Sequence, residues 1–327
     1  IQHQDGRTPS LENQQLLDSA LDELNPDAVA IPGWGHDFSR RALKWCQRKA
    51  KRAILMSESK YDDAPRFWLK ELAKKWLYVR RFDSAVVGGK RHREYLEMLG
   101  MSPQNIFPGY DVVDNDFFIS NVDAVSGKKC TSEDGLPNAP FFLASNRFID
   151  RKNIKFLIRA FSEYRRQTKS SVFDLVLLGN GELMDDLKSF VSELGLENQV
   201  HFPGFIAYKD ICSWYAAASV FVHPATSEQW GLVVNEAMAA GLPTLVSQTC
   251  GCMPDLMREG ETGYSFDPTR LEDLVAKMLI VANNQGLRKA MGTAARVLIQ
   301  QQYSADSFAE GVAAAVSLAM QSAPKDN

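Results

Sequence analysis

The chain has 327 residues, of which 45% are hydrophobic, so it is long enough for two domains that each bury a core. No stretch of about 18 apolar residues is present, and the sequence therefore predicts no transmembrane helix. Its five cysteines are few for this length and odd in number. This usage is typical of a reducing compartment, and we expect a cytoplasmic protein.

The formal net charge of −3 conceals a strongly basic region. Residues 39–93 contain 17 Lys and Arg against 5 Asp and Glu. Within them, residues 65–82 (PRFWLKELAKKWLYVRRF) predict a basic amphipathic helix with Trp68 and Trp76 in its apolar stripe. Such a helix is typical of proteins that lie on an anionic membrane surface, and the alternative is a helix packed on a domain core with a solvated basic face. No nucleic-acid-reading motif is present, so we expect no nucleic-acid partner.

Strands and helices alternate over the first 120 residues. Leucines at helical spacing predict a helix over 10–24, which Asn25-Pro26 ends. Short apolar runs predict strands at 28–31, 53–56 and 85–87. The alternation indicates an α/β domain with a parallel sheet.

Glycine, serine and proline pairs between 121 and 140 indicate a linker. We therefore expect a first domain over 1–120, a linker over 121–140 and a second domain over 141–303. Residues 304–327 form a final predicted helix and a short tail.

The second domain opens with an apolar strand at 141–144, which delivers Ser145, Asn146 and Arg147 to its carboxyl end. Lys152 follows at the start of a predicted helix, NIKFLIRAF. Two fixed cations beside a strand end can neutralise a departing diphosphate, and stabilising such charge is often the largest catalytic term. Because Arg and Lys are common in loops, a solvated pair of charges is the alternative.

Two glycine turns follow the next predicted strands, 174–178 and 199–202. The first turn contains Gly179 and Gly181 around Asn180, and the second contains Gly204 and Phe205. A single G-x-G is a weak nucleotide signal, because it lacks a third glycine and a ribose-binding acid at the expected distance. The backbone of the second turn is a candidate contact for a base.

The segment TSEQWGLVVNEAMAAGLPTLVS, residues 226–247, carries the strongest signal. It follows a predicted strand at 219–224, predicts a helix from about Gly231 to Gly241, and ends in another strand. Ligands of such units bind at the carboxyl ends of the strands, and the first N–H groups of the helix can bind a phosphate. Glu228 then lies in the loop and Glu236 in the helix, where a carboxylate can accept hydrogen bonds from a ribose diol. The alternative is that both are solvated charges.

The pattern E-x7-E within EQWGLVVNEAMAAGLP resembles the signature of the group 1 (family 4) retaining nucleotide-sugar glycosyltransferases. The resemblance implies an α/β protein of the GT-B fold, with two Rossmann-like domains facing a central cleft and a C-terminal helix that crosses back to the first domain. It implies that Glu228 faces the donor sugar and that Glu236 binds the ribose. The backbone of Gly231 and Leu232 then meets the diphosphate, and Arg147 and Lys152 hold it.

The same resemblance places the turns of Gly179, Gly181, Gly204 and Phe205 close to the nucleotide. It also implies no tightly bound cofactor and no metal, because GT-B enzymes usually bind the diphosphate without one. The D-x-D of Asp114-Asn115-Asp116 is short and common, so it does not alter this expectation.

The first domain departs from the family. Several family strands that precede residue 28 have no counterpart here, so we expect an N-terminally incomplete copy with a truncated first domain. The family often carries a His near the reacting sugar, whereas this chain has Ser57-Glu58-Ser59. Glu58 and His36 are weak candidates for acceptor contacts, with ordinary loop-end polar groups as the alternative.

The resemblance thus predicts a retaining hexosyltransferase that moves a sugar from a UDP-, GDP- or ADP-sugar to an acceptor hydroxyl. Polysaccharide, lipopolysaccharide or glycolipid synthesis is the expected context, with a glycan or lipid-linked acceptor and an enzyme on the inner face of an anionic membrane. The alternatives are a catalytically silent nucleotide-sugar-binding remnant, or another GT-B enzyme such as an epimerase or a phosphorylase.

Overall fold

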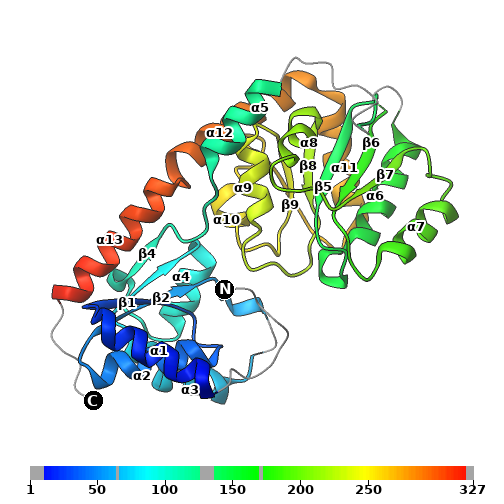
Figure 1. The fold of residues 1–327 in the computed structure, drawn as a ribbon. Coiled ribbons are helices and arrows are strands. Elements are labelled where there is room, and N and C mark those ends of the chain that lie inside the picture. Colours follow the sequence, from blue (N-terminus) through cyan, green and yellow to red (C-terminus); the bar gives the residue numbers. More distant parts are fainter. Residues whose placement is uncertain (1–10, 64–65, 126–135, 169–171, 322–327) are drawn as a thin grey trace. The chain divides into compact units, whose positions relative to one another are not determined.

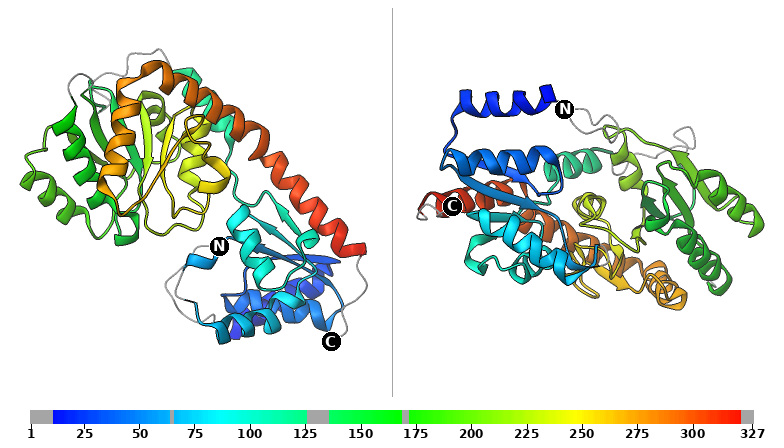
Figure 2. Two further views of the ribbon diagram at one scale, coloured as in Figure 1. Left: turned by 180° about the vertical axis from the view of Figure 1, so that it is seen from behind. Right: turned by 90° about the horizontal axis from the view of Figure 1, so that it is seen from below.

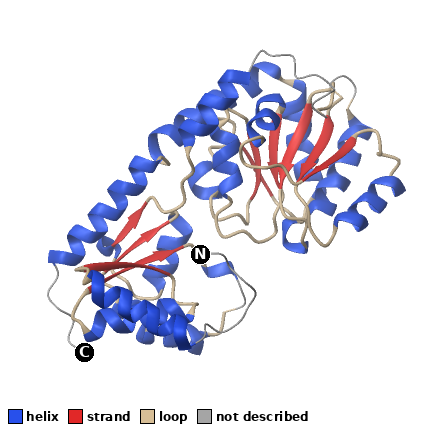
Figure 3. Ribbon diagram, in the orientation of Figure 1, coloured by secondary structure: helices blue, strands red, loops and turns tan. Residues whose placement is uncertain are grey.

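The computed structural model describes residues 11–63, 66–125, 136–168 and 172–321. The chain divides into two units, the first made of residues 1–111 together with 306–327 and the second of residues 112–305. Each unit is built on a parallel β-sheet that is covered by helices (Figures 1 and 3). The expected α/β class is therefore confirmed.

The first unit contains a four-stranded sheet in the order β1-β2-β3-β4. Its strands are β1 (Ala28–Pro32), β2 (Arg52–Ser57), β3 (Ser84–Val87) and β4 (Ile106–Pro108). Its helices are α1 (Leu11–Leu24), α2 (Asp37–Arg48), α3 (Trp68–Leu77), α4 (Lys90–Met98) and α13 (Ala305–Gln321). Three of the four strands follow the sequence prediction; β4 was not predicted because three residues ending in proline give no periodic signal.

Two cores sandwich this sheet. One face packs Leu55, Ala85 and Val87 against Trp45 of α2 and Leu96 of α4. The other packs Ile54 and Val86 against Ala315 and Ala319 of α13. The Ser84 hydroxyl donates to the Ala315 carbonyl oxygen at 2.8 Å, and a Cβ at Gly311 would lie 2.1 Å from the Pro108 carbonyl oxygen. The end of the chain is therefore an integral layer of the first unit, as Figure 2 also shows.

The second unit contains a six-stranded sheet in the order β10-β9-β8-β5-β6-β7. Its strands are β5 (Phe141–Ser145), β6 (Asp174–Leu178), β7 (Val200–Gly204), β8 (Val220–His223), β9 (Thr244–Ser247) and β10 (Gly263–Phe266). One face is covered by α5 (Asn115–Val125), α8 (Ile211–Ala217), α9 (Leu232–Ala239) and α12 (Gln285–Gln302). The other is covered by α6 (Ile154–Gln167), α7 (Met184–Glu193) and α11 (Leu271–Asn283). The short α10 (Met253–Leu256) follows β9.

The boundaries differ from those expected. Residues 121–125, expected in the linker, belong to α5, so that prediction is wrong at its start. Composition did not reveal this because the helix is fixed by tertiary packing: Phe118 and Val122 are buried in the core of the second unit. Residues 126–135 of the expected linker lie outside the described residues.

Helix α3 presents its apolar residues to solvent. None of its residues is buried. The exposed apolar side chains are Phe67, Trp68, Leu69, Leu72, Trp76 and Leu77, with exposed fractions from 45% to 74%. The inner side of the helix is polar instead, with Glu71 accepting from Lys74 and from the hydroxyl of Tyr95. The alternative in which the apolar stripe packs on a core therefore does not describe this helix.

Candidate functional site

The candidate site lies where the strand order of the second sheet reverses. Strands β5 and β8 are neighbours, with β6 and β7 on one side and β9 and β10 on the other. In open parallel sheets, ligands bind beyond the carboxyl ends of the strands at such a switch point. Arg147 and Lys152 come from the loop after β5, and Glu228 comes from the loop after β8. These three predicted site residues thus lie on the two loops that flank the switch point.

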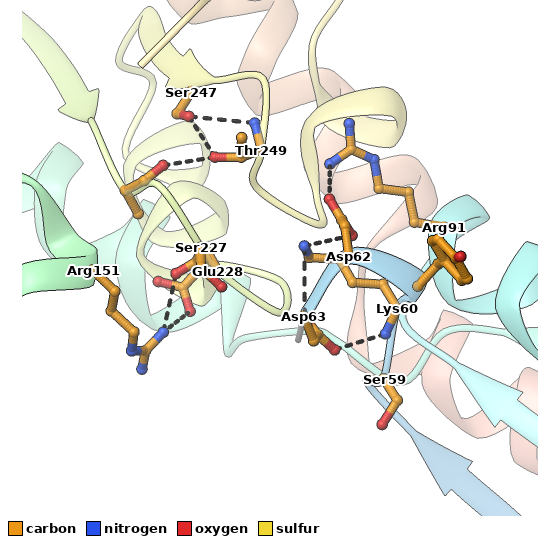
Figure 4. Close-up of polar contacts among 12 residues, drawn as sticks. Ser59, Lys60, Asp62, Asp63, Arg91, Arg151, Ser227, Glu228, Ser247 and Thr249 are labelled. Carbon is orange, nitrogen blue, oxygen red and sulfur yellow. Dashed lines mark hydrogen bonds and ion pairs between the residues drawn. The ribbon is translucent and has the colours of Figure 1, made fainter. Parts of the chain in front are cut away.

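Backbone and side-chain hydrogen bonds tie these two loops together. The Thr226 N–H donates to the Arg151 carbonyl oxygen at 2.9 Å, and the Arg151 guanidinium donates to the Ser227 carbonyl oxygen at 3.2 Å. From the next loop, the Thr249 hydroxyl donates to the Ala225 carbonyl oxygen at 2.8 Å. Figure 4 shows Arg151 directed at Ser227 and Glu228. The loops therefore form one hydrogen-bonded structure.

Glu228 occupies the centre of a charged cluster. Its side chain is almost buried and forms an ion pair with Lys152. Nη1 of Arg151 lies 3.4 Å from its Oε1, and Nε2 of His223 lies 3.2 Å from its Oε2. Two cations and an imidazole thus converge on one carboxylate.

The ionisation of this cluster follows from its surroundings. Burial alone would raise the pKa of Glu228, but the hydrogen bond from His223 and the positive charge of Lys152 hold it well below its usual range. Burial lowers the pKa of His223, outweighing the opposing effect of Glu228, so the imidazole is neutral at pH 7. The ionised carboxylate only accepts hydrogen bonds, so Nε2 of His223 carries the proton. Lys152 and Arg151 supply the positive charge.

Gly231 directly precedes α9, as its N-cap, in a conformation that suits glycine. Its φ is +110°, and an added Cβ would lie 3.4 Å from Cγ of Glu228 and 3.5 Å from Nε2 of His223. Leu232, the first residue of α9, is exposed. The next residue, Val233, lines the cavity described below, whereas Gly231 and Leu232 do not. The predicted diphosphate contact of these two residues remains a prediction.

A cavity of about 660 Å³ opens at the carboxyl ends of β5 and β6. Among the predicted site residues, Arg147, Lys152, Gly179, Phe205 and Glu236 line it. The other lining residues are Ser145, Asn146, Arg151, Leu178, Asn180, Ile206, Tyr208, Ile211 and Val233. The cavity thus collects three cations, one carboxylate and the two exposed aromatic rings of Phe205 and Tyr208 within a single unit.

Glu236 enters the cavity from α9. Its Oε2 accepts a hydrogen bond of 2.7 Å from the hydroxyl of Tyr215, which is itself fully buried. Burial raises the pKa of Glu236, although the Tyr215 hydrogen bond opposes this. Tyr215 therefore holds one carboxylate oxygen in place.

Gly179 and Gly181 allow the loops after β5 and β6 to touch. Gly179 has a φ of +121°, and a Cβ there would lie 1.9 Å from the Asn146 carbonyl oxygen. A Cβ at Gly181 would lie 2.3 Å from the Phe148 carbonyl oxygen. Both glycines thus have a packing reason to be present.

The turn after β7 adds the aromatic edge of the cavity. Gly204 has a φ of +85°, and its carbonyl oxygen accepts from the Gly179 N–H at 2.8 Å. Phe205 is 79% exposed although it is a large apolar residue beside a cavity. Its ring is therefore available to a ligand.

In the first unit, Glu58 follows β2 and pairs with a buried acid. It shares a hydrogen bond with Asp111, which is 3% exposed. Burial, and then the charge of Glu58, raise the pKa of Asp111 to about 8. The two carboxyl groups therefore share a proton at neutral pH. Position 88 has room only for glycine, because a Cβ added at Gly88 would lie 1.8 Å from Oδ2 of Asp111.

Two further polar side chains, His36 and Lys60, follow β1 and β2. His36 is exposed at the start of α2 and stacks on Phe38 with ring centroids 6.0 Å apart. Lys60 is 1% exposed, and its ammonium group lies 2.8 Å from Oδ1 of Asp62 and 3.5 Å from Oδ1 of Asp63. Figure 4 shows these three side chains facing one another. An acceptor contact for His36 and Glu58 remains a prediction.

Sequence reasoning missed four residues of these sites. Arg151 directly precedes Lys152, and His223 ends β8 at the ligand-binding edge, so position could have drawn attention to both. Tyr215 and Asp111 gave no local signal, since their partners Glu236 and Glu58 are distant in sequence.

Metal-binding clusters and membrane-spanning helices are both absent from the described residues. Within the described residues, no group of three or more His, Cys, Asp or Glu could hold a metal ion. Asp114, from the D-x-D sequence, instead accepts from the Phe117 N–H at 2.9 Å at the start of α5. In the described part of the chain, no helix has both the length and the apolar character needed to cross a membrane.

A parallel sheet with a reversed strand order, and a cavity at that point lined by cations and a carboxylate, define a protein of the α/β class with a ligand-type cavity at the switch point. The family "Glycosyl transferases group 1" matches residues 132–298, and the chain belongs to it. Solved glycosyltransferases have the same fold, which is GT-B. A glycosyltransferase from Rickettsia africae superposes with a TM-score of 0.78 at 16% identity, covering 98% of this chain and 85% of its own. HepE of Anabaena, solved with UDP, has a TM-score of 0.78 at 18% identity, covering 94% and 84%.

Curated relatives match part of this chain. The Arabidopsis thaliana sulfoquinovosyl transferase is 34% identical over 125 residues, which is 37% of this chain and 24% of the relative. A GDP-mannose-dependent phosphatidylinositol monomannoside mannosyltransferase of Mycolicibacterium smegmatis is 28% identical over 191 residues, or 56% and 49%. The match thus spans between a quarter and a half of these relatives.

Proposed function

We propose that this protein transfers a sugar from a UDP-, GDP- or ADP-sugar to an acceptor hydroxyl, with the anomeric configuration retained. The observation that carries the proposal is the cavity in which Arg147, Lys152 and Glu236 meet at the switch point. HepE, of similar fold, has been solved with UDP and glucose, and the mycobacterial relative is named for its dependence on GDP-mannose. Both names support a nucleotide-sugar donor.

In the proposed reaction, Arg147 and Lys152 hold the leaving diphosphate. Fixed charges of this kind stabilise the negative charge that develops as the glycosidic phosphate bond breaks. Glu228 holds Lys152 and Arg151 in position. Its role toward the donor sugar is carried over from the family resemblance alone. Glu236, oriented by Tyr215, accepts from the ribose. The acceptor attacks from the face that the phosphate leaves, and a phosphate oxygen takes the acceptor proton.

The first test is a panel of UDP-, GDP- and ADP-sugars in a thermal-shift assay. A ligand at about 100 times its dissociation constant adds about 2.7 kcal/mol to the stability of the folded state. Transfer to an acceptor panel, with the product anomer read by NMR, then tests turnover and retention. Binding without turnover would favour the silent remnant, an epimerised donor would favour the epimerase, and no binding at all would end the proposal.

Arg147→Ala is the matching variant, because the side chain lines the cavity and is exposed. Loss of a preorganised donor of this kind typically lowers turnover about 100- to 1000-fold. Arg166→Ala is the control, since Arg166 is also exposed but pairs with Glu163 on α6. Equal activity of the two variants would remove Arg147 from the mechanism.

We further propose that the first unit holds the protein on the cytoplasmic face of an anionic membrane, with a lipid-linked acceptor. The supporting observation is the exposed apolar side of α3, where Arg80 stacks on Trp76 at 3.9 Å and Lys70 lies 5.3 Å from the Phe67 ring centroid. Basic side chains around exposed aromatics match an anionic interface. Each basic residue near such a surface contributes about 1 kcal/mol.

Co-sedimentation with anionic and neutral vesicles at low and high salt tests this surface. We expect recovery only with anionic vesicles at low salt, because the attraction fades within a Debye length of about 8 Å at physiological ionic strength. Trp68→Ser with Trp76→Ser should abolish recovery. Ile280→Ser with Val297→Ser is the control, since these residues are exposed and apolar in the second unit. Equal recovery under all conditions would leave a soluble acceptor as the better proposal.

A further inference from the structure

Asn146 has a buried amide side chain that lines the cavity. It directly follows β5, and its N–H donates to the Leu178 carbonyl oxygen at 3.0 Å. Its carbonyl oxygen lies against Gly179, where even a Cβ would approach to 1.9 Å. The backbone is thus fixed between β5 and β6. The side chain is 8% exposed and lines the cavity.

Among the described residues, the side-chain amide of Asn146 has no hydrogen-bond partner for either of its polar atoms. Neither Nδ2 nor Oδ1 bonds to any other described residue. Buried polar side chains are nearly always paired, because leaving one unpaired destabilises the folded protein. Asn235 shows the usual case in the same unit, since it is fully buried and its Oδ1 accepts from Trp230 at 2.9 Å. An unpaired amide facing a cavity therefore points to a ligand.

The chemistry of the amide narrows the ligand group. Nδ2 only donates and Oδ1 only accepts, so both ends are satisfied by groups that can donate and accept. An ionised diphosphate offers acceptors alone, and Arg147 and Lys152 of the same cavity already provide its donors. A hydroxyl group donates and accepts, and a vicinal pair of hydroxyls matches both amide atoms.

We infer that Asn146 is a specificity-determining residue that binds hydroxyl groups of the nucleotide-sugar donor. The inference rests on the proposed function of the cavity. The hydroxyls belong either to the ribose or to the transferred sugar, and the same amide chemistry serves both. Asn146 thereby selects hydroxylated donors over analogues that lack the group, because a buried amide then stays unpaired.

The test combines binding with stability in Asn146→Leu, which keeps the side-chain size and removes both polar atoms. Calorimetry measures the affinity of wild type and variant for UDP, UDP-glucose and pyrophosphate, and for the GDP- and ADP-based counterparts. We expect about tenfold weaker binding of the sugar nucleotide, equivalent to about 1.4 kcal/mol, and unchanged binding of pyrophosphate. Without ligand, the variant should be at least as stable as wild type, whereas Asn235→Leu should be less stable.

The possible results identify which hydroxyl groups Asn146 binds, and they distinguish failure of this inference from failure of the proposed function. A loss for both UDP and UDP-glucose that recurs with the GDP- and ADP-based counterparts assigns the contact to the ribose, which all of them share. A loss for the sugar nucleotides alone assigns it to the sugar, and a loss confined to one base would overturn the inference. Equal weakening of pyrophosphate, unchanged affinity for every probe, or lower stability of ligand-free Asn146→Leu would each overturn the inference while leaving the proposed function intact. If wild type binds none of the nucleotides, the proposed function fails and the inference fails with it.

Discussion

Replacing Lys152 by alanine should reduce both stability and turnover, and the structure gives the magnitude. The side chains of Lys152 and Glu228 are only 13% and 11% exposed, so the carboxylate depends on its partners for its charge. Removing one partner of a buried ion pair costs about 3–5 kcal/mol. Because Arg151 and His223 remain in contact with Glu228, we expect the lower end of that range, about 3 kcal/mol.

Arg147→Ala provides the contrast. Arg147 is exposed, and surface substitutions usually change stability by less than about 0.5 kcal/mol. For a unit of this size, about 3 kcal/mol corresponds to a fall in Tm of about 10 °C. Thermal unfolding at pH 7 should therefore separate the two variants clearly, while both lose turnover. Lys152→Met combined with Glu228→Gln should recover most of the lost stability, because a neutral pair leaves no buried charge alone.

The pH dependence supplies a second check on the same reasoning. The folded-state pKa of Glu228 lies below its unfolded value of 4.5. Its contribution to stability is therefore complete above about pH 4.5 and is lost as the pH falls toward the folded pKa. The stability difference between wild type and Lys152→Ala should be largest near neutral pH and shrink on acidification. If Lys152→Ala is as stable as Arg147→Ala at pH 7, the ion-pair reasoning is refuted.

Substitutions at three other positions, Glu236, Gly179 and Asp111, have definite expected outcomes. Glu236→Ala should weaken nucleotide binding by about 1.5–3 kcal/mol, the usual contribution of a hydrogen bond to a charged group, and unchanged affinity for UDP, GDP and ADP would exclude the ribose role. Because burial raises the pKa of Glu236, Glu236→Gln should also stabilise the ligand-free protein above the unfolded pKa of 4.5, with a gain that disappears in acid, as urea unfolding against pH would show. Gly179→Ala should lower stability by several kcal/mol through the collision with Asn146, whereas Gly195→Ala, with open space and a φ of +64°, should cost only about 1–2 kcal/mol; similar melting temperatures would contradict this. Asp111→Asn should gain stability relative to wild type as the pH rises from about 4 to about 8, because the raised folded pKa makes deprotonation unfavourable for folding, and a constant difference over that range would disprove the shared proton.

The elements around Glu228 were predictable because their signals are local. The apolar run of β8, the glycine before α9 and the left-handed Gly241, with a φ of +81°, all specify backbone geometry within a few residues. The loop position of Glu228 and the helical position of Glu236 follow directly. The order of the strands in the sheet is not predictable from such local signals, because nothing in the sequence of β5 indicates that β8 is one of its neighbours.

The partners of these acids were not predictable from local patterns. Tyr215 meets Glu236 only because α8 and α9 cover the same face of the sheet. The hydrogen bond between Glu58 and Asp111 depends on the parallel alignment of β2, β3 and β4. Residues 121–125, the end of α5, were assigned to the linker because Val122 is fixed in a helix by packing in the core of the second unit, which local sequence does not reveal. Local sequence thus predicts whether a functional residue lies in a loop or a helix, whereas tertiary packing determines its hydrogen-bond partners.

The packing of α13 on the first sheet has a consequence for biosynthesis. Ile54 and Val86 are covered by Ala315 and Ala319, which are translated more than two hundred residues later. Domains generally fold as units during synthesis, beginning at the N-terminus. The first unit cannot follow that order here, because its sheet lacks one covering layer until α13 leaves the ribosome. The second unit, continuous from 112 to 305, can complete its core first, and the apolar face of the earlier-made sheet is exposed to chaperones during that interval.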